Sequence, residues 1–462
     1  MFLDFRSKRE LPEILFLLPL MVLFFFSITG LNVFADDTVA AKSAATLEIE
    51  KRLDTIRYGI ETQVIELLAT LKSEKNDDYL QDLLLAYDSS TSPRLKAALL
   101  EFYADRKNKE AEKRATELIR DRDKNEDFLV ASAFSYLLAI KSQSALEYAV
   151  SILDDEEKKY IPAAIKTIGA MGSELEAEVL RTAYDAEGAD AATKEAIILA
   201  LGSMKSTASF DLISSILKTD ESTKTQRMYA CTALGELADP RSIPVLIEAS
   251  QTIDPNVRSY AIAALGTYDS LEAMAAVREG LRDSHVLVRL AAVKAIGKTL
   301  DKEAIPFLEY KASYDPEKAV REASIAGLAA IGGAQVEDYL TGLFGDAKMA
   351  VQYRSTALGS IVAKGGEAAR QKALEAFMVA QADKDRALFT AYAKAALAVD
   401  DSSAEPFAQA LLADKDFSMR LGAILWVDRN KAVELKETLR VLSETDPNDA
   451  VKKRAALALG RL

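Results

Sequence analysis

The sequence predicts an all-α protein, a right-handed α-solenoid (superhelix) in which antiparallel helix pairs stack side by side. Two observations support this fold class. Similar segments recur about every 32 residues, and five of them end in a glycine: Gly169, Gly202, Gly235, Gly266 and Gly297. The segments are rich in alanine and leucine, without the alternation of β-branched residues that is typical of strands.

The clearest unit runs from Asp239 to Gly266. Its first helix is expected to contain Pro244 in the first turn. Proline lacks a backbone N–H, but an N–H in the first turn of a helix has no acceptor within the helix, so nothing is lost there. Its second helix is expected to begin after Asp254, whose side chain can cap the free N–H groups. Glycine inside a helix costs about 1 kcal/mol relative to alanine. Its recurrence near the end of the second helices therefore indicates either a helix end or a close approach between helices.

Aspartates recur before the second helices, and a basic residue follows most of them. Three such pairs are Asp254 with Arg258, Asp283 with Arg289, and Asp315 with Arg321. Opposite charges at fixed places in each unit predict a ladder of ion pairs that joins one repeat to the next. The alternative is a set of independent surface charges, each contributing about 0–1 kcal/mol.

The segment Asp254-Pro-Asn-Val-Arg258, followed by Ala263-Ala-Leu-Gly266, resembles the HEAT repeat, and specifically the short variant found in bilin lyases. The resemblance covers most of the chain and is strongest from Lys194 to Gly332. It implies that the second helix of each pair lines a concave face, where partners usually bind. HEAT arrays serve as scaffolds, as adaptors and, in a few cases, as enzymes, so the resemblance is specific for the fold and not for the function.

The N-terminal residues have the pattern of an export signal. Basic residues Arg6, Lys8 and Arg9 precede an apolar run from Ile14 to Ile28, and small Ala35 fits a cleavage site. The alternative is a retained anchor, since about 20 apolar residues can cross a bilayer. The expected organisation is a signal peptide at 1–35, an N-terminal helical cap or atypical repeat at 36–90, and a solenoid of about 12 units at 91–462.

The charge of the chain limits its partners. The sequence has 58 lysines and arginines against 71 aspartates and glutamates, a net charge of −13. Such a surface repels nucleic acid and favours cationic or neutral partners. We therefore expect protein or peptide partners, with membrane contact only if the leader is retained.

The residues needed for chemistry are scarce. The single histidine, His285, rules out a histidine-based triad or zinc site, and the single cysteine, Cys231, lies among small residues as a buried apolar side chain would. The segment Asp121–Asn125 starts like a calcium loop but has Glu126 and Ser132 where glycine and glutamate are required. The sequence predicts no catalytic residue, no metal and no cofactor.

Aromatic residues in the second helices are candidates for partner binding, because aromatic side chains make effective anchors. They are Tyr229, Tyr260, Tyr353, Phe389, Tyr392 and Trp426. The alternative is that these side chains fill gaps left between alanine-rich helices.

On this basis we expect a non-catalytic scaffold or adaptor that mediates protein–protein interactions in the periplasm or cell envelope. Two alternatives stay open. One is a lyase-like enzyme or chaperone that handles a small cofactor on the concave face, which requires acid–base groups there. The other is a membrane-tethered assembly factor, which requires the leader to be retained.

Overall fold

The computed structural model describes residues 44–154, 158–383 and 386–462. The expected leader, residues 1–35, lies outside this range. Every regular element in the described ranges is helical. The predicted all-α solenoid is confirmed.

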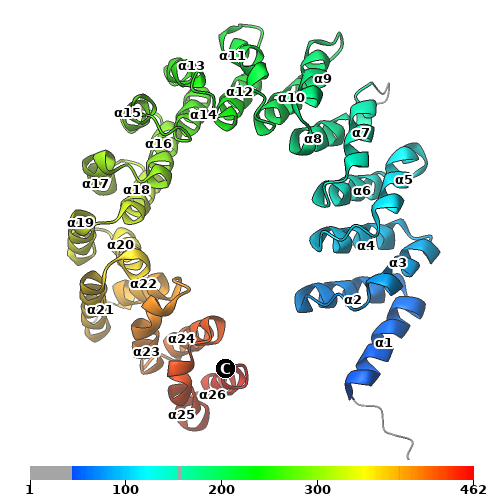
Figure 1. Cartoon of the computed structure of the whole chain (residues 1–462). Helices are drawn as coiled ribbons and strands as arrows, with labels where there is room; N and C mark the ends of the chain where they lie inside the picture. Colours follow the sequence, from blue (N-terminus) through cyan, green and yellow to red (C-terminus); the bar gives the residue numbers. More distant parts are fainter. Residues whose placement is uncertain (1–43, 155–157, 384–385) are drawn as a thin grey trace, which may run out of the picture.

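From α3 onward the helices alternate between two layers, the odd-numbered ones outside and the even-numbered ones inside (Figure 1). The outer helices are α3 Leu80–Ser89, α5 Glu112–Arg120, α7 Gln143–Ile152, α9 Glu174–Asp185, α11 Phe210–Lys218, α13 Ser242–Ala249, α15 Leu271–Gly280, α17 Ile305–Tyr314, α19 Ala334–Gly345, α21 Glu367–Ala382, α23 Glu405–Leu412 and α25 Lys436–Thr445. The inner helices are α4 Pro93–Asp105, α6 Asp127–Ala139, α8 Ile161–Met171, α10 Ala191–Ser203, α12 Lys224–Leu237, α14 Pro255–Leu265, α16 Val286–Thr299, α18 Lys318–Ile331, α20 Val351–Lys364, α22 Arg386–Leu397, α24 Phe417–Asn430 and α26 Asp449–Leu459. Short 3-10 turns lie in several connections: η1 Arg122–Lys124, η2 Lys158–Tyr160, η3 Thr207–Ser209, η4 Lys302–Ala304, η5 Ser402–Ala404 and η6 Val433–Leu435.

The N-terminal end is built from α1 (Ala44–Tyr58) and α2 (Glu61–Glu74). Helix α2 packs against α4 as the other inner helices pack against one another. Helix α3, which the sequence analysis placed in the cap, packs against α4 and is the outer helix of the first regular pair. The regular pairs therefore begin about ten residues before the expected position 91.

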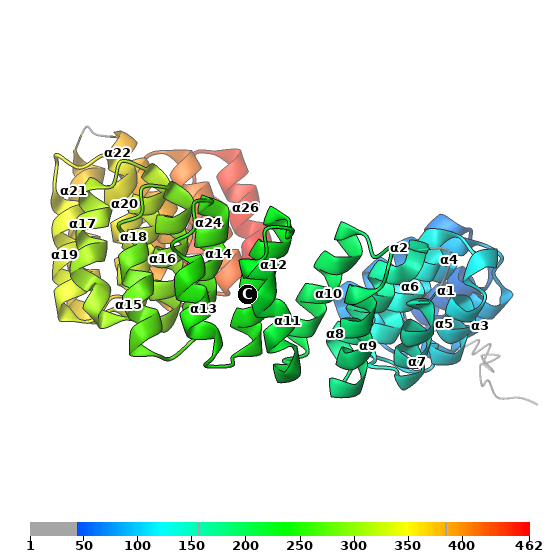
Figure 2. The ribbon, with the colours of Figure 1, turned by 90° about the horizontal axis from the view of Figure 1, so that it is seen from above.

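The stacked pairs curve through most of a ring, with the first helix α1 and the last helix α26 on opposite sides of the opening (Figure 1). Seen from above, the two sides of the ring are displaced along its axis, as expected for a superhelix (Figure 2). Among the described residues, no helix is both long enough and apolar enough to cross a membrane.

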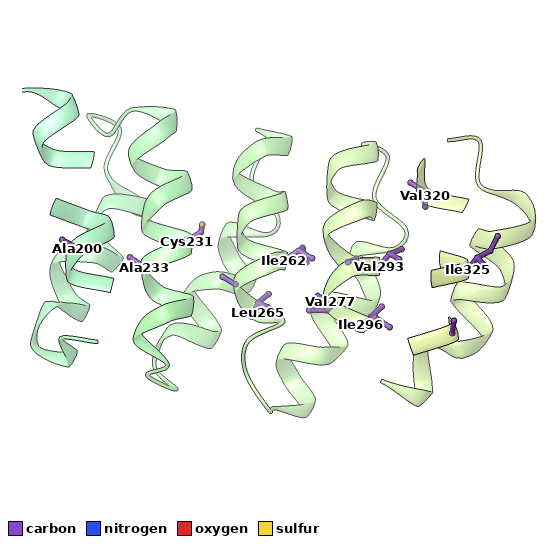
Figure 3. Packing of buried hydrophobic residues seen from close by; sticks show 14 of the residues in the cluster. Ala200, Cys231, Ala233, Ile262, Leu265, Val277, Val293, Ile296, Val320 and Ile325 are labelled. Atoms are coloured by element: carbon purple, nitrogen blue, oxygen red, sulfur yellow. The ribbon is translucent and has the colours of Figure 1, made fainter. Parts of the chain in front are cut away.

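The core is one continuous row of apolar side chains between the two layers. In the central repeats it contains Cys231, Ile262, Leu265, Val293 and Ile296, which point into the space between successive helices (Figure 3). Because each layer buries its apolar face only against its neighbours, a single pair has no core of its own. Stability therefore depends on the contacts between repeats.

Candidate interaction surface

The inner helices line the concave side of the ring (Figure 1). Each packs against its outer partner and against the inner helices before and after it, so only one face stays exposed. Glycine makes this packing close. A Cβ on Gly202 would lie 2.5 Å from the Cα of Ala233, and a Cβ on Gly266 would lie 2.5 Å from the Cβ of Ala295. Gly202 is the penultimate residue of α10 and Gly266 is the C-cap of α14, so the recurring glycine stands both at a helix end and at a close approach between helices.

Two of the predicted aromatic residues reach the concave surface on neighbouring helices. Tyr229 on α12 and Tyr260 on α14 both stand six residues before a recurring glycine. Tyr260 is 36% exposed and Tyr229 is half-buried. Ala263, one turn after Tyr260, is exposed and small. The result is a shallow surface with aromatic side chains one repeat apart.

The other four predicted aromatic residues are buried, so the prediction of a continuous aromatic stripe for partner binding is wrong for them. They are Tyr353, Phe389, Tyr392 and Trp426, with exposed fractions of 6%, 0%, 0% and 1%. Their burial agrees with the alternative interpretation, in which these side chains fill gaps between repeats.

Helical register explains the difference. Successive residues are turned by about 100° around a helix, and Trp426 lies two residues before Asp428, the residue that replaces the glycine. At that angle its ring points toward the preceding repeat, where Nε1 donates a hydrogen bond to the carbonyl oxygen of Val399 at 2.7 Å. The hydroxyl of Tyr392 likewise donates to the carbonyl oxygen of Phe344 at 2.6 Å.

The predicted ladder of ion pairs exists in part. Arg258 Nε and Nη2 donate to the two carboxylate oxygens of Asp283 at 2.8 and 2.9 Å. Arg289 holds Asp315 in the same way at 2.9 and 3.0 Å. Each arginine therefore pairs with an aspartate of the next repeat, and Asp315 is buried. Asp254 stands at a different position, because its carboxylate caps α14 through the N–H groups of Asn256 and Val257. It still joins two repeats, since its Oδ2 lies 3.2 Å from Nζ of Lys224 on the preceding inner helix α12.

The ladder stops at Arg321, which corrects the prediction for this residue. Its Nε donates to the carbonyl oxygen of Ala312 at 3.0 Å, and its guanidinium stacks 3.7 Å from the ring centre of Tyr353. Asp346, the aspartate expected to follow, is exposed and stands five residues before α20, whereas Asp315 stands three before α18. The longer loop places Met349 beside Arg321, with Sδ 3.4 Å from Nη2. The ladder resumes toward the C-terminus, where Arg386 Nη2 lies 3.5 Å from buried Asp414 and Arg420 holds buried Asp446 at 2.7 and 2.9 Å.

We call each arginine–aspartate pair of the ladder a rung. The rung one repeat before Arg258 is also missing. Arg227 has a buried Nε with no hydrogen-bond partner, and Thr252 stands 25 residues after it, the spacing that separates Arg258 from Asp283. We expect Thr252→Asp to add a charged hydrogen bond and to raise the free energy of unfolding by about 1 kcal/mol. Urea denaturation followed by circular dichroism measures this change. The gain should vanish when Arg227 is replaced by glutamine, and a gain that persists in that background contradicts the pairing.

The rungs perturb the acidity of their aspartates. Burial by itself raises the pKa of Asp283 and of Asp315, but hydrogen bonds from Arg258 and Arg289 and from backbone N–H groups outweigh it, so that both pKa values are lowered. The pKa of Asp254 falls to about 2, first because the side chain of Asn256 donates to its carboxylate. All three are held as carboxylates at neutral pH.

The other residues considered for chemistry have structural surroundings. His285 caps α16, with Nδ1 accepting a hydrogen bond from the N–H of Leu287 at 3.3 Å. Cys231 is fully buried, and this burial raises the pKa of its thiol to about 12. Asp121 pairs with Lys124 at 3.0 Å. Within the described ranges, no group of three or more histidine, cysteine, aspartate or glutamate side chains is placed to hold a metal ion.

One cluster at the C-terminal ends of inner helices α24 and α26 was missed by the sequence analysis. Asp428, which stands where most inner helices have a small residue, is 7% exposed. It accepts hydrogen bonds from Arg454 Nη2 at 3.3 Å and Arg461 Nη1 at 2.9 Å. Lys431 Nζ lies 3.5 Å from it. The sequence does contain a signal that could have predicted this cluster. A carboxylate occupies a position where most units have a small residue, and arginines follow about one repeat later.

Stacked pairs with close inner helices, an aspartate–arginine ladder and a concave surface define a HEAT-repeat α-solenoid. The chain belongs to the spirochaete HEAT repeat protein family, whose model matches residues 56–458. No curated protein matches the chain.

Solved structures with a similar fold include large solenoids. Yeast importin-beta (Kap95p) is 13% identical, with 90% of this chain and 65% of that chain covered and a TM-score of 0.52. Kap121p is 11% identical, with 93% and 52% covered and a TM-score of 0.41. YibA of Escherichia coli is 17% identical, with 54% and 93% covered and a TM-score of 0.38. This chain thus spans about two thirds of the importin-beta it resembles, and the likeness shows the fold alone.

Proposed function

We propose that this protein is an exported, non-catalytic scaffold that binds protein partners along its concave surface in the periplasm or cell envelope. The observation that carries the proposal is the exposed concave surface, on which Tyr229 and Tyr260 lie one repeat apart. A long curved surface offers many weak contacts, and their sum gives useful affinity without a deep pocket.

The surroundings of the buried carboxylates support a non-catalytic role. Asp315, Asp428 and Asp446 are all buried, and each is held by at least one arginine. Burial raises the pKa of Asp315 and of Asp446, but hydrogen bonds from Arg289 and Arg420 outweigh it and lower both pKa values, so these two carboxylates stay ionised and committed to their partners. This suits a structural link between repeats. General acid–base catalysis instead needs a group whose pKa lies near the working pH.

Export is supported by the leader-like pattern of residues 1–35. Mass spectrometry of the N-terminal peptide from native cells tests it, because the proposal expects a mature chain that begins at Asp36. Recovery of the peptide that starts at Met1 from membranes would favour the tethered assembly factor.

The binding surface is tested by a photo-crosslinking residue placed at Ala263, which is exposed on inner helix α14. Tyr310 on outer helix α17, which is 60% exposed, is the matched convex position. We expect crosslinked proteins from intact cells at Ala263 and few or none at Tyr310. Equal crosslinking at both positions would remove the support for a concave binding surface.

Replacing both Tyr229 and Tyr260 with alanine is expected to weaken capture of the crosslinked partner about tenfold or more, because exposed aromatic anchors dominate interface energies. Titration of that partner on the purified variant measures the loss. The control is the double replacement of Tyr310 and Tyr314, an exposed aromatic pair on the convex side. A loss of the same size in the control contradicts the assignment of the surface.

A further inference from the structure

Charge is segregated between the two helix layers in the C-terminal half of the solenoid. The inner helices α16, α18, α20, α22, α24 and α26 contain fourteen lysines and arginines and three acidic residues, Glu322, Asp428 and Asp449. The outer helices α15, α17, α19, α21, α23 and α25 contain ten acidic residues and six basic ones. The whole chain carries a net charge of −13, so the net charge of these inner helices is opposite in sign to that of the chain.

Several of these cations have no ion-pair partner among the described residues. Lys294 in the middle of α16 and Lys394 in α22 are exposed, and neither takes part in a salt bridge within that part of the chain. Because the other sides of an inner helix pack against neighbouring helices, an exposed residue in its middle faces the concave side. Lys453 on α26 is also exposed. The concave side therefore presents the unpaired positive charges of Lys294 and Lys394, and Lys453 adds another at the open end of the stack.

A depression with a volume of about 460 Å³ lies at the C-terminal end of this surface. Leu425, Asp428, Arg429, Lys431, Arg454 and Arg461 line it. Asp428 fixes Arg454 and Arg461 in place and also lies 3.5 Å from Nζ of Lys431, so that one carboxylate faces three cations. Arg429 has its own partner in Asp400 at 2.5 Å. The side chains of Lys431 and Arg461 are 55% and 56% exposed, so their remaining donors are open to solvent. Positioned guanidinium groups with free donors are typical of a site for carboxylates.

We propose that the concave side of α16–α26 binds an acidic segment of a partner polypeptide, with one of its carboxylates seated among Lys431, Arg454 and Arg461. The proposal rests on the proposed function and names the partner's chemistry. An extended peptide can follow the row of inner helices and place carboxylates near Lys394 and Lys294 in turn. Nucleic acid is disfavoured, because a long polyanion also meets the acidic outer layer and the net negative charge of the chain.

The test measures the binding of fluorescent peptides to the full-length mature chain by anisotropy. The probe is a glutamate-rich 20-residue peptide, compared with the same peptide carrying glutamine and with a single-stranded oligonucleotide of equal charge. We expect the acidic peptide to bind more tightly than both, with an affinity that falls as salt rises. The double variant Lys294→Gln/Lys394→Gln should lose about two- to tenfold in affinity, since exposed charge pairs each contribute modestly.

The matched control is Lys372→Gln/Lys436→Gln, which removes the same charge from exposed positions on α21 and α25 and should leave the affinity unchanged. Both pairs replace exposed lysines, so circular dichroism should show equal folding. Equal losses in the two variants, equal binding of the glutamine peptide, or tighter binding of the oligonucleotide would each overturn the proposal. If the acidic peptide does not bind while Ala263 still crosslinks to proteins in cells, the acidic partner is excluded and the scaffold function stands. If Ala263 also captures no protein, both the acidic partner and the scaffold function are contradicted.

Discussion

Replacing Asp315 with asparagine is expected to lower the free energy of unfolding by about 3–5 kcal/mol, because it leaves the guanidinium of Arg289 buried without its counter-charge. Asp315 and Arg289 are 3% and 6% exposed and are joined by two hydrogen bonds of 2.9 and 3.0 Å. Urea denaturation gives the total change. Hydrogen exchange locates it, since the loss should be largest in α16 and α18, the inner helices that this rung joins.

The control is Asp346→Asn, which makes the same chemical change at an exposed aspartate that stands at the corresponding loop position but carries no rung. Its effect should stay within about 0.5 kcal/mol. An Asp315 variant as stable as the Asp346 variant would mean that the rung contributes nothing to the stacking of repeats.

Acid provides a second readout of the same rung. The pKa of Asp315 is lower in the folded chain than its ordinary value, so its stabilising contribution is fully present above about pH 4 and is lost as the pH falls through the folded-state value. The wild-type chain should therefore lose stability more steeply below pH 4 than the Asp315→Asn variant. Parallel pH profiles for the two proteins would contradict a depressed pKa at this position.

The repeat pattern determines the parts of this molecule that are the same in every unit. Recurring Gly202 and Gly266 predicted either a helix end or a close contact between inner helices, and recurring Arg258 and Arg289 predicted a ladder, because each signal returns at the same helical position. The partners were assigned less well, since an arginine pairs with the aspartate of the next repeat. Asp254 illustrates this, because it stands beside Arg258 in sequence but serves as a helix cap.

Features that depend on rotation about a helix or on loop length were harder to predict. Tyr260 and Trp426 both lie in inner helices, but a difference of a few residues relative to the glycine position decides that the first is exposed and the second buried. The end of the ladder at Arg321 depends on two additional residues between Asp346 and α20. The positive inner layer was hidden in the net charge of −13, because its sign appears only after the helices are sorted into layers.

Replacing Gly266 with alanine is expected to lower the free energy of unfolding by about 1–3 kcal/mol, because the added Cβ overpacks the contact between α14 and α16. The new atom would lie 2.5 Å from the Cβ of Ala295 and 3.2 Å from its Cα, well inside van der Waals distance. The two helices must then separate or tilt relative to each other, and this shifts the position of every later repeat in the stack. Urea denaturation measures the cost, and small-angle scattering should show a change in the curvature of the ring.

The reciprocal change tests whether contact between the two residues is the cause. Ala295→Gly by itself should cost about 1 kcal/mol through helix propensity. Combined with Gly266→Ala it should restore part of the lost stability, because one methyl group again occupies the space. Gly342→Ala on outer helix α19 is the control: its added Cβ meets nothing within 4 Å, so alanine should stabilise that helix by about 0.5–1 kcal/mol. Strictly additive effects of Gly266→Ala and Ala295→Gly would show that the recurring glycine serves the backbone of its own helix and not the approach of the next repeat.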